Sequence, residues 1–224
     1  MPSRRVDRAS IPQTIPVFPL PGALLLPRGQ MPLNIFEPRY LAMVDAALGG
    51  ARVIGMVQPR TGADGAVEEG DKPGLSEIGC AGRITSFAET DDGRYVITLT
   101  GLTRFRVIEE LDTTTPYRQA QIDVGAFEED RTPRAGEDTV DRKRLLETFR
   151  AYLEANELQA DWDSVNQAGN ESLVNALAML SPYGPREKQA LLEAPDLATR
   201  AELLIAITEL SMAEDGTGEE TTLQ

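Results

Sequence analysis

The chain has 224 residues, 41% of them hydrophobic, which is enough for one large or two small domains with a buried core. Acidic residues outnumber basic ones by 36 to 22, and a formal net charge of −14 would repel phosphate backbones and anionic membranes. The absence of histidine excludes Ser-His-Asp and Cys-His catalysis and histidine metal sites.

The first elements along the chain are short strands and one helix. Residues 1–13 begin as a polar, basic stretch, for which we expect a disordered arm. "TIPVFPL" (14–20) and "MPLNIF" (31–36) are typical of strands, the first confined to an edge or irregular position by its prolines. "PRYLAMVDAAL" (38–48) has the apolar spacing of a helix that begins at proline and ends at Gly49-Gly50.

Further strands follow up to residue 127. "RVIGMVQ" (52–58) is a buried-type strand, and residues 59–76 form a loop long enough to be mobile or functional. Two strands, 77–90 and 95–111, flank the hairpin turn "DDGR". The second alternates cleanly, and Gly101 at its centre predicts a bend of the kind found at barrel corners.

The hydrophobic period changes from 2 to 3.6 after a charged segment at 128–138, which we interpret as a linker. Four helices are predicted within residues 139–212, the last one with Asp196 as its N-cap, and residues 213–224 are expected to be a disordered acidic tail. The predicted class is therefore α+β: a β-rich domain at 14–127, about six strands plus one helix, followed by a four-helix bundle.

The charged residues at the start of the first helix allow two interpretations. Glu37 and Arg39 flank Pro38, and they either face a substrate or fix the strand-to-helix junction, which we favour. Arg104 and Arg106 either bind an acidic ligand or form solvent-facing ion pairs with the abundant carboxylates, again the favoured alternative.

Residues with chemical potential elsewhere have ordinary structural explanations. Cys80 is expected to be an inert buried thiol, and Trp162 an interdomain or helix-packing anchor. None of the three lysines belongs to a phosphate-binding loop, and nothing around Ser181 and Lys188 builds an oxyanion hole for a catalytic dyad. We therefore expect no enzyme, no cofactor and no metal.

Compartment and membrane expectations follow from the same composition. The single cysteine suits a reducing compartment, and no apolar stretch typical of a signal peptide follows the basic start. The longest apolar runs are too short to span a bilayer. We expect a cytoplasmic protein that binds neither membrane nor nucleic acid.

Three segments resemble the N-terminal substrate-binding domain of the Lon (La) ATP-dependent protease. They are "IPVFPLPGALLLPRGQMPLNIFEPRYLAMVDAAL", "EIGCAGRITSF…DGRYVITLTGLTRFRVIEEL" and "LVNALAMLSPYGPREKQALLEAPDLATRAELLIAITEL". Together they span roughly residues 14–212, and neither the ATPase module nor the Ser-Lys peptidase domain of that protease is present. The resemblance implies a PUA-like pseudo-barrel plus a helical bundle, in a bacterial protein associated with proteolysis and quality control.

The resemblance also implies a function. It indicates a non-catalytic module, an adaptor or substrate-capture protein, that binds unfolded or hydrophobic polypeptide segments. A full-length Lon-type protease acting in trans is a candidate partner. The candidate groove lies between barrel and bundle or under the 59–76 loop, or an exposed sheet edge pairs with an extended peptide. The candidate lining residues are Phe36, Tyr40, Met43 and Met56; the alternative, which we favour for each of them, is a position in the apolar core.

Two alternatives remain open. The first is a small-ligand or regulatory sensor on the PUA-like barrel, although an aromatic cage is poorly supplied by a chain with one tryptophan. The second is RNA binding, which depends on fold analogy and is opposed by the net charge.

Overall fold

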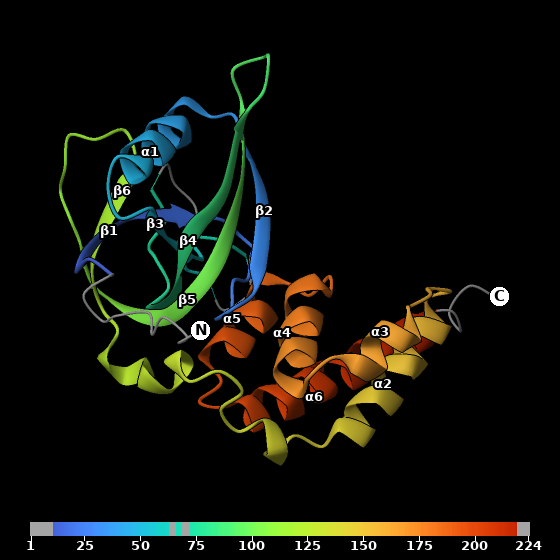
Figure 1. The fold of residues 1–224 in the computed structure, drawn as a ribbon. Coiled ribbons are helices and arrows are strands. Elements are labelled where there is room, and N and C mark those ends of the chain that lie inside the picture. The colour runs from blue at the N-terminus through green and yellow to red at the C-terminus, as the bar shows by residue number, and fades with distance from the viewer. Residues whose placement is uncertain (1–10, 63–65, 69–71, 219–224) are drawn as a thin grey trace. The chain divides into compact units, whose positions relative to one another are not determined.

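The computed structural model describes residues 11–62, 66–68 and 72–218 (Figure 1). The chain divides into two compact units. The first contains the chain up to Pro133 together with Pro182–Leu192, and the second contains Arg134–Ser181 together with the chain from Glu193 onward. Residues 1–10 of the predicted disordered arm at 1–13 lie outside the described residues.

The first unit is built on one mixed sheet (Figure 1). Its strands are β1 (Thr14–Pro19), β2 (Gln30–Ile35), β3 (Val53–Val57), β4 (Ile78–Glu89), β5 (Tyr95–Glu110) and β6 (Arg118–Asp123). The order is β2-β5-β4-β3-β1-β6, with β1 and β3 parallel and the other neighbours antiparallel.

The sheet curls but keeps an edge. β6 pairs with β1 and also with the C-terminal part of β5, because β5 is long enough to reach both sides of the sheet. Among the described strands β2 pairs with β5 alone. The expected pseudo-barrel is thus a curled six-stranded sheet that does not form a closed barrel.

Gly101 lies in the middle of β5, opposite the chain segment that precedes β2. A Cβ atom at this position would stand 2.0 Å from the carbonyl oxygen of Leu26. The Gly101 N–H donates to the Gly29 carbonyl at 2.9 Å, and the Gly101 carbonyl accepts from the Arg28 N–H at 2.8 Å. Only glycine allows the two backbones to approach this closely.

Helix α1 (Pro38–Leu48) begins where the periodicity predicts. Pro38 occupies the first helical turn, where its missing N–H leaves no hydrogen bond broken. Its buried face consists of Tyr40, Met43, Val44 and Ala47. The helix therefore packs one apolar face, along most of its length, against the rest of the first unit.

Arg104 is the clearest departure from the sequence analysis. Arg106 is exposed and pairs with Glu77 at 2.9 Å, as expected, but Arg104 is only 4% exposed. The guanidinium of Arg104 donates from Nη2 to Asp130 Oδ1 at 2.9 Å and from Nε to Asp130 Oδ2 at 3.0 Å. The prediction of a solvent-facing Arg104 is wrong because the 3₁₀ helix η2 (Gly125–Arg131) folds over this part of β5.

Helix α5 (Pro185–Glu193) was expected in the helical domain, but up to Leu192 it belongs to the first unit. Gln58 donates to the Pro185 carbonyl at 2.9 Å, Gln189 donates to the Ile78 carbonyl at 3.1 Å, and Arg104 donates to the Leu192 carbonyl at 3.1 Å. Each of these bonds joins a side chain to a backbone carbonyl about a hundred residues away, so no local pattern predicts them.

The second unit is helical. It contains η3 (Glu137–Thr139), α2 (Arg142–Ala155), α3 (Trp162–Gln167), α4 (Asn170–Leu180) and α6 (Leu197–Gly218). Asp141, Asp161 and Asp196 accept backbone N–H bonds at the starts of α2, α3 and α6. The short helix α3 was not expected, and the four-helix arrangement changes because α5 belongs elsewhere.

The end of α6 also differs from expectation. We predicted a disordered tail from residue 213, but the helix continues to Gly218 because no proline interrupts the segment. Residues 219–224 of the predicted tail lie outside the described residues.

Candidate functional site

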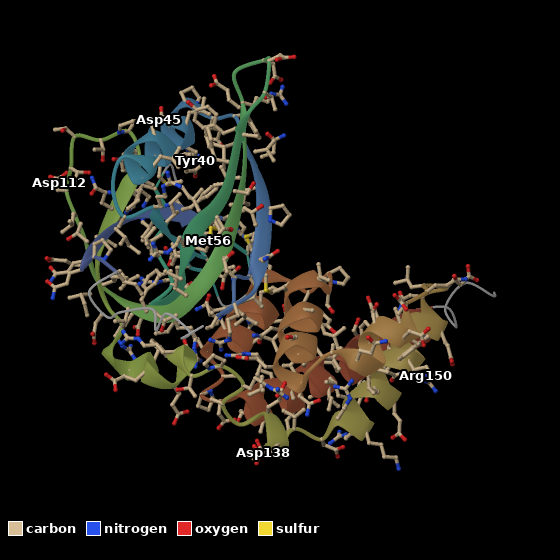
Figure 2. The ribbon with its side chains drawn as sticks, viewed as in Figure 1. Tyr40, Asp45, Met56, Asp112, Asp138 and Arg150 are labelled. Atoms are coloured by element: carbon tan, nitrogen blue, oxygen red, sulfur yellow. The ribbon has the colours of Figure 1, made fainter. Side chains whose placement is uncertain are left out.

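The four predicted groove residues have very different environments; Figure 2 labels two of them, Tyr40 and Met56. Phe36 is 60% exposed, Tyr40 is 8% exposed, and Met43 and Met56 are 0% and 3% exposed. The two methionines are therefore core residues and line no open surface. Only Phe36 and Tyr40 lie together at a concave site.

That site is a groove of about 280 Å³ in the first unit. Its walls come from the end of β1 and the following turn, the end of β2 and the start of α1. The lining residues are Phe18, Pro19, Leu20, Pro21, Leu33, Asn34, Ile35, Phe36, Glu37, Arg39 and Tyr40. Most of these side chains are apolar, as in sites that bind apolar ligand groups.

Two aromatic residues of the groove, Tyr40 and Phe36, differ in exposure. The rings of Phe18 and Tyr40 lie with centroids 4.2 Å apart, so Tyr40 is held in the packed interior. Phe36 follows the last residue of β2 and remains exposed, with the Arg94 guanidinium 5.9 Å from its ring centroid. Phe36 therefore extends the apolar lining of the groove to a solvent-exposed rim.

The charged residues of the groove are already paired. Arg39 Nη2 lies 2.8 Å from Glu37 Oε2, and the Arg39 guanidinium stands 4.5 Å from the centroid of the Tyr40 ring. Glu37 occupies the N-cap position of α1 without a side-chain hydrogen bond to the helix. Burial raises the pKa of the Tyr40 hydroxyl, so this group stays protonated at neutral pH.

The end of β2, from Leu33 to Ile35, lines the groove, and the rest of the strand leads up to it. The Gly29 carbonyl accepts from Gly101, and backbone groups alternate in direction along an antiparallel strand. Met31 and Leu33 therefore direct their backbone groups toward β5, and Pro32 faces the unpaired edge. A proline at this point leaves the centre of the edge without an N–H donor.

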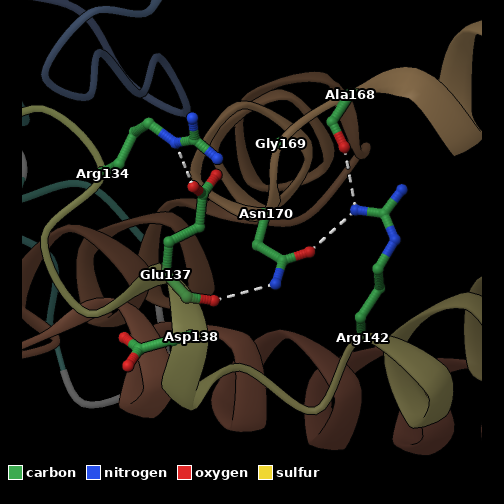
Figure 3. Close-up of a pocket in the computed structure, with 7 residues that line it drawn as sticks. All are labelled: Arg134, Glu137, Asp138, Arg142, Ala168, Gly169 and Asn170. Atoms are coloured by element: carbon green, nitrogen blue, oxygen red, sulfur yellow. Dashed lines mark hydrogen bonds and ion pairs between the residues drawn. The ribbon is translucent and has the colours of Figure 1, made fainter.

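A larger pocket of about 450 Å³ lies in the second unit and is polar (Figure 3). Arg142 Nη1 donates to the Asn170 Oδ1 atom at 2.7 Å and to the Ala168 carbonyl at 2.9 Å. Asn170 Nδ2 in turn donates to the Glu137 carbonyl at 2.8 Å. The polar groups of this polar pocket thus bind one another.

Glu137 completes the network by capping a helix. Its Oε1 atom accepts the Glu171 N–H at 3.0 Å, near the start of α4, and its carboxylate forms an ion pair with Arg134. These bonds lower the pKa of the Glu137 carboxyl. A Cβ on Gly169 would lie 2.5 Å from Glu137 Oε1, so glycine leaves the space that this cap needs. The sequence gives no sign of the pairing, since Glu137 and Glu171 are distant along the chain.

The remaining predicted residues occupy structural positions. Cys80 is buried in β4, and Trp162 begins α3 with the Arg150 guanidinium 4.5 Å from its ring. Lys188 is buried, and desolvation lowers its pKa to about 8. Within the described part of the chain, no three acidic, cysteine or histidine side chains gather in a way that could hold a metal ion.

Comparison of the fold with solved structures defines the class of protein. A crystal structure of a Lon N-terminal domain protein from Xanthomonas campestris superposes with a TM-score of 0.60, 23% identity and coverage of 86% of this chain and 97% of that one. The N-terminal domain of a Lon protease from the Mycobacterium avium complex gives 0.59, 18% identity, and 88% and 98% coverage. The chain has the fold of Lon N-terminal domains.

The family model described as the ATP-dependent protease La (LON) substrate-binding domain matches residues 14–209, and the chain belongs to this family. Lon protease 2 of Myxococcus xanthus is 28% identical over 92% of this chain, and Lon protease of Desulfosudis oleivorans is 28% identical over 85%. The chain spans about a quarter of the length of these relatives, 24% and 23% respectively.

The helices give one further finding. Across residues 11–62, 66–68 and 72–218, none is both long and apolar enough to pass through a bilayer.

Proposed function

We propose that this protein is a non-catalytic module that captures unfolded polypeptide segments in protein quality control. In this proposal it acts as an adaptor or substrate-capture protein in the bacterial cytoplasm, and it works alongside a full-length Lon-type protease in trans. Membership of the Lon substrate-binding family supports the recognition of polypeptides, and the match is confined to that domain.

The observation that carries the proposal is the exposed Phe36 at the rim of the apolar groove. An apolar side chain that enters the groove removes its own surface and part of the Phe36 ring from water. Burial of one such side chain contributes about 1.5–3 kcal/mol before the costs of association are subtracted. A single groove therefore predicts weak and reversible capture, which suits a protein that must pass its client onward.

The test compares two exposed apolar residues in the same unit. Phe36→Ala should weaken the binding of a permanently unfolded, fluorescently labelled polypeptide by about tenfold, because the variant loses much of the apolar contact area. Ile108→Ala is the matched control, since Ile108 is 53% exposed on β5 outside the groove and should bind normally. Equal affinity of wild type and both variants would assign binding to another surface.

A second assay addresses the absence of catalysis. The protein should suppress the aggregation of the unfolded polypeptide without cleaving it, whether or not ATP is added. Cleavage that survives stringent purification and disappears in Ser181→Ala would contradict the non-catalytic proposal.

A further inference from the structure

The size of the groove limits what it can hold. A volume of about 280 Å³ is at the low end of ligand sites, and the walls are formed by short stretches of three elements. The groove suits one large apolar side chain from an extended segment. The residues on either side of that anchor must then lie over the surface around the groove.

The unpaired edge of β2 is a poor template for strand addition. An added strand forms hydrogen bonds at every second residue, and Pro32 removes the donor at the centre of a six-residue strand. The bound segment therefore gains little from backbone pairing. Its side chains, both the anchor and the flanking residues, carry the recognition.

The hairpin between β4 and β5, which reaches Phe36 through Arg94, carries several charged side chains. Arg94 contacts the Phe36 ring from the hairpin between β4 and β5, but its charge is matched by Asp92 at 2.9 Å. The exposed Glu89 and Asp91 on the same hairpin have no ion-pair partner among the described residues.

Helix α1 adds a third carboxylate. Asp45 is exposed on this helix (Figure 2), and its interaction with the Tyr95 hydroxyl raises the pKa of that hydroxyl. The Glu37–Arg39 pair at the groove itself is neutral. Glu89 and Asp91 on the hairpin, together with Asp45 on α1, are here called the hairpin acids; they lie on the two elements that flank Phe36, since Phe36 precedes α1 and contacts Arg94 of the hairpin.

We propose that the groove selects polypeptide segments in which one large apolar side chain is flanked by lysine or arginine. The proposal depends on the polypeptide-binding function above and adds the chemistry of the client. The hairpin acids attract the basic flanks, and the formal charge of −14 favours the approach of cationic segments over longer distances. Acidic segments of equal hydrophobicity are repelled.

The experiment measures fluorescence anisotropy with three labelled Gly/Ser peptides that carry one central phenylalanine. The residues flanking the phenylalanine are lysines in the first peptide, serines in the second and glutamates in the third. The lysine peptide should bind about three- to tenfold more tightly than the serine peptide in dilute salt, and this advantage should shrink as salt screens the charges. The glutamate peptide should bind most weakly.

Charge variants assign the preference to the hairpin. The double variant Glu89→Gln and Asp91→Asn should abolish most of the advantage of the lysine peptide while leaving the serine peptide unchanged. The matched control is Glu109→Gln with Glu129→Gln, which removes two exposed carboxylates at the far end of β5 and on η2. An equal loss in the control would show a response to net charge alone and would overturn the role of the hairpin acids.

The possible failures are distinguishable. Equal affinity for all three peptides, with loss of binding in Phe36→Ala, would refute the charge preference and leave the proposed function standing. No binding of any peptide or unfolded polypeptide would refute both. Backbone N-methylation of the lysine peptide should change its affinity little. A large loss of affinity would mean that the peptide binds by strand addition and not through its side chains. A dimer in sedimentation that Phe36→Ala dissolves would assign the groove to a second copy.

Discussion

The groove of the first unit and the polar pocket of the second differ in whether their lining groups are already bonded within the protein. The polar pocket is larger, but Arg142, Asn170 and Glu137 bind one another and the start of α4. The groove is smaller, but it keeps Phe36 exposed beside apolar walls. The two sites therefore differ less in size than in whether their lining groups are already bonded within the protein, and the proposed function assigns binding to the site whose exposed group is not.

The comparison predicts that polar contacts maintain the fold while exposed apolar contacts serve binding. Among the substitutions considered, the one at Arg104, in the first unit, should lower the free energy of unfolding most. Arg104→Ala leaves Asp130 buried without its partner and removes the donor to the Leu192 carbonyl. We expect a loss of about 3–5 kcal/mol in the free energy of unfolding, measured by urea denaturation.

The matched variant Arg106→Ala removes an exposed ion pair with Glu77 from the same strand. It should cost less than about 1 kcal/mol. A similar cost for both variants would mean that burial does not decide the contribution of these arginines.

Arg142 tests the polar pocket itself. Arg142→Ala leaves the Ala168 and Val165 carbonyls without this donor, and we expect the free energy of unfolding to fall by about 2–4 kcal/mol. Affinity for an unfolded polypeptide should stay unchanged. Arg144→Ala, which removes an exposed pair with Glu209, is the control, and weakened binding in Arg142→Ala alone would contradict a purely structural pocket.

Lys188 is a buried cation of the first unit whose pKa is about 8 in the folded protein and about 10.5 when unfolded. Between these values the unfolded chain binds more protons, so stability should rise with pH by on the order of 1–3 kcal/mol. Stability measured from pH 7.5 to 9.5 should show this rise in the wild type and a flatter profile in Lys188→Met. A parallel rise in both proteins would assign the effect to another group.

Phe36 gives the smallest expected effect on stability. Because its ring is largely exposed, Phe36→Ala should change the free energy of unfolding by less than about 0.5 kcal/mol while weakening binding. Thermal unfolding of the variant used in the binding assay provides the measurement. A loss of several kcal/mol would show that Phe36 belongs to the core and that reduced binding reflects misfolding.

The sequence predicts the elements whose position depends on local residue patterns. Period-2 alternation locates β5, and Pro38 with the spacing that follows locates α1. Distant partners explain the failures: Arg104 points inward because η2 covers it, and Met43 is buried because α1 packs its apolar face into the first unit. Phe36 and Met43 are both large apolar residues, and only the surrounding fold decides which one meets solvent.

The path of the chain limits which fragments of this protein can be expressed as a complete unit. The polypeptide crosses from one unit to the other near residues 133, 181 and 192, so the first unit is discontinuous in sequence. A fragment that stops at the charged segment after β6 loses Gln189 and the Leu192 carbonyl, and leaves Ile78 and Arg104 without these partners. The two units are therefore expected to be inherited and expressed together, and swapping one between relatives requires replacing two separate stretches of gene.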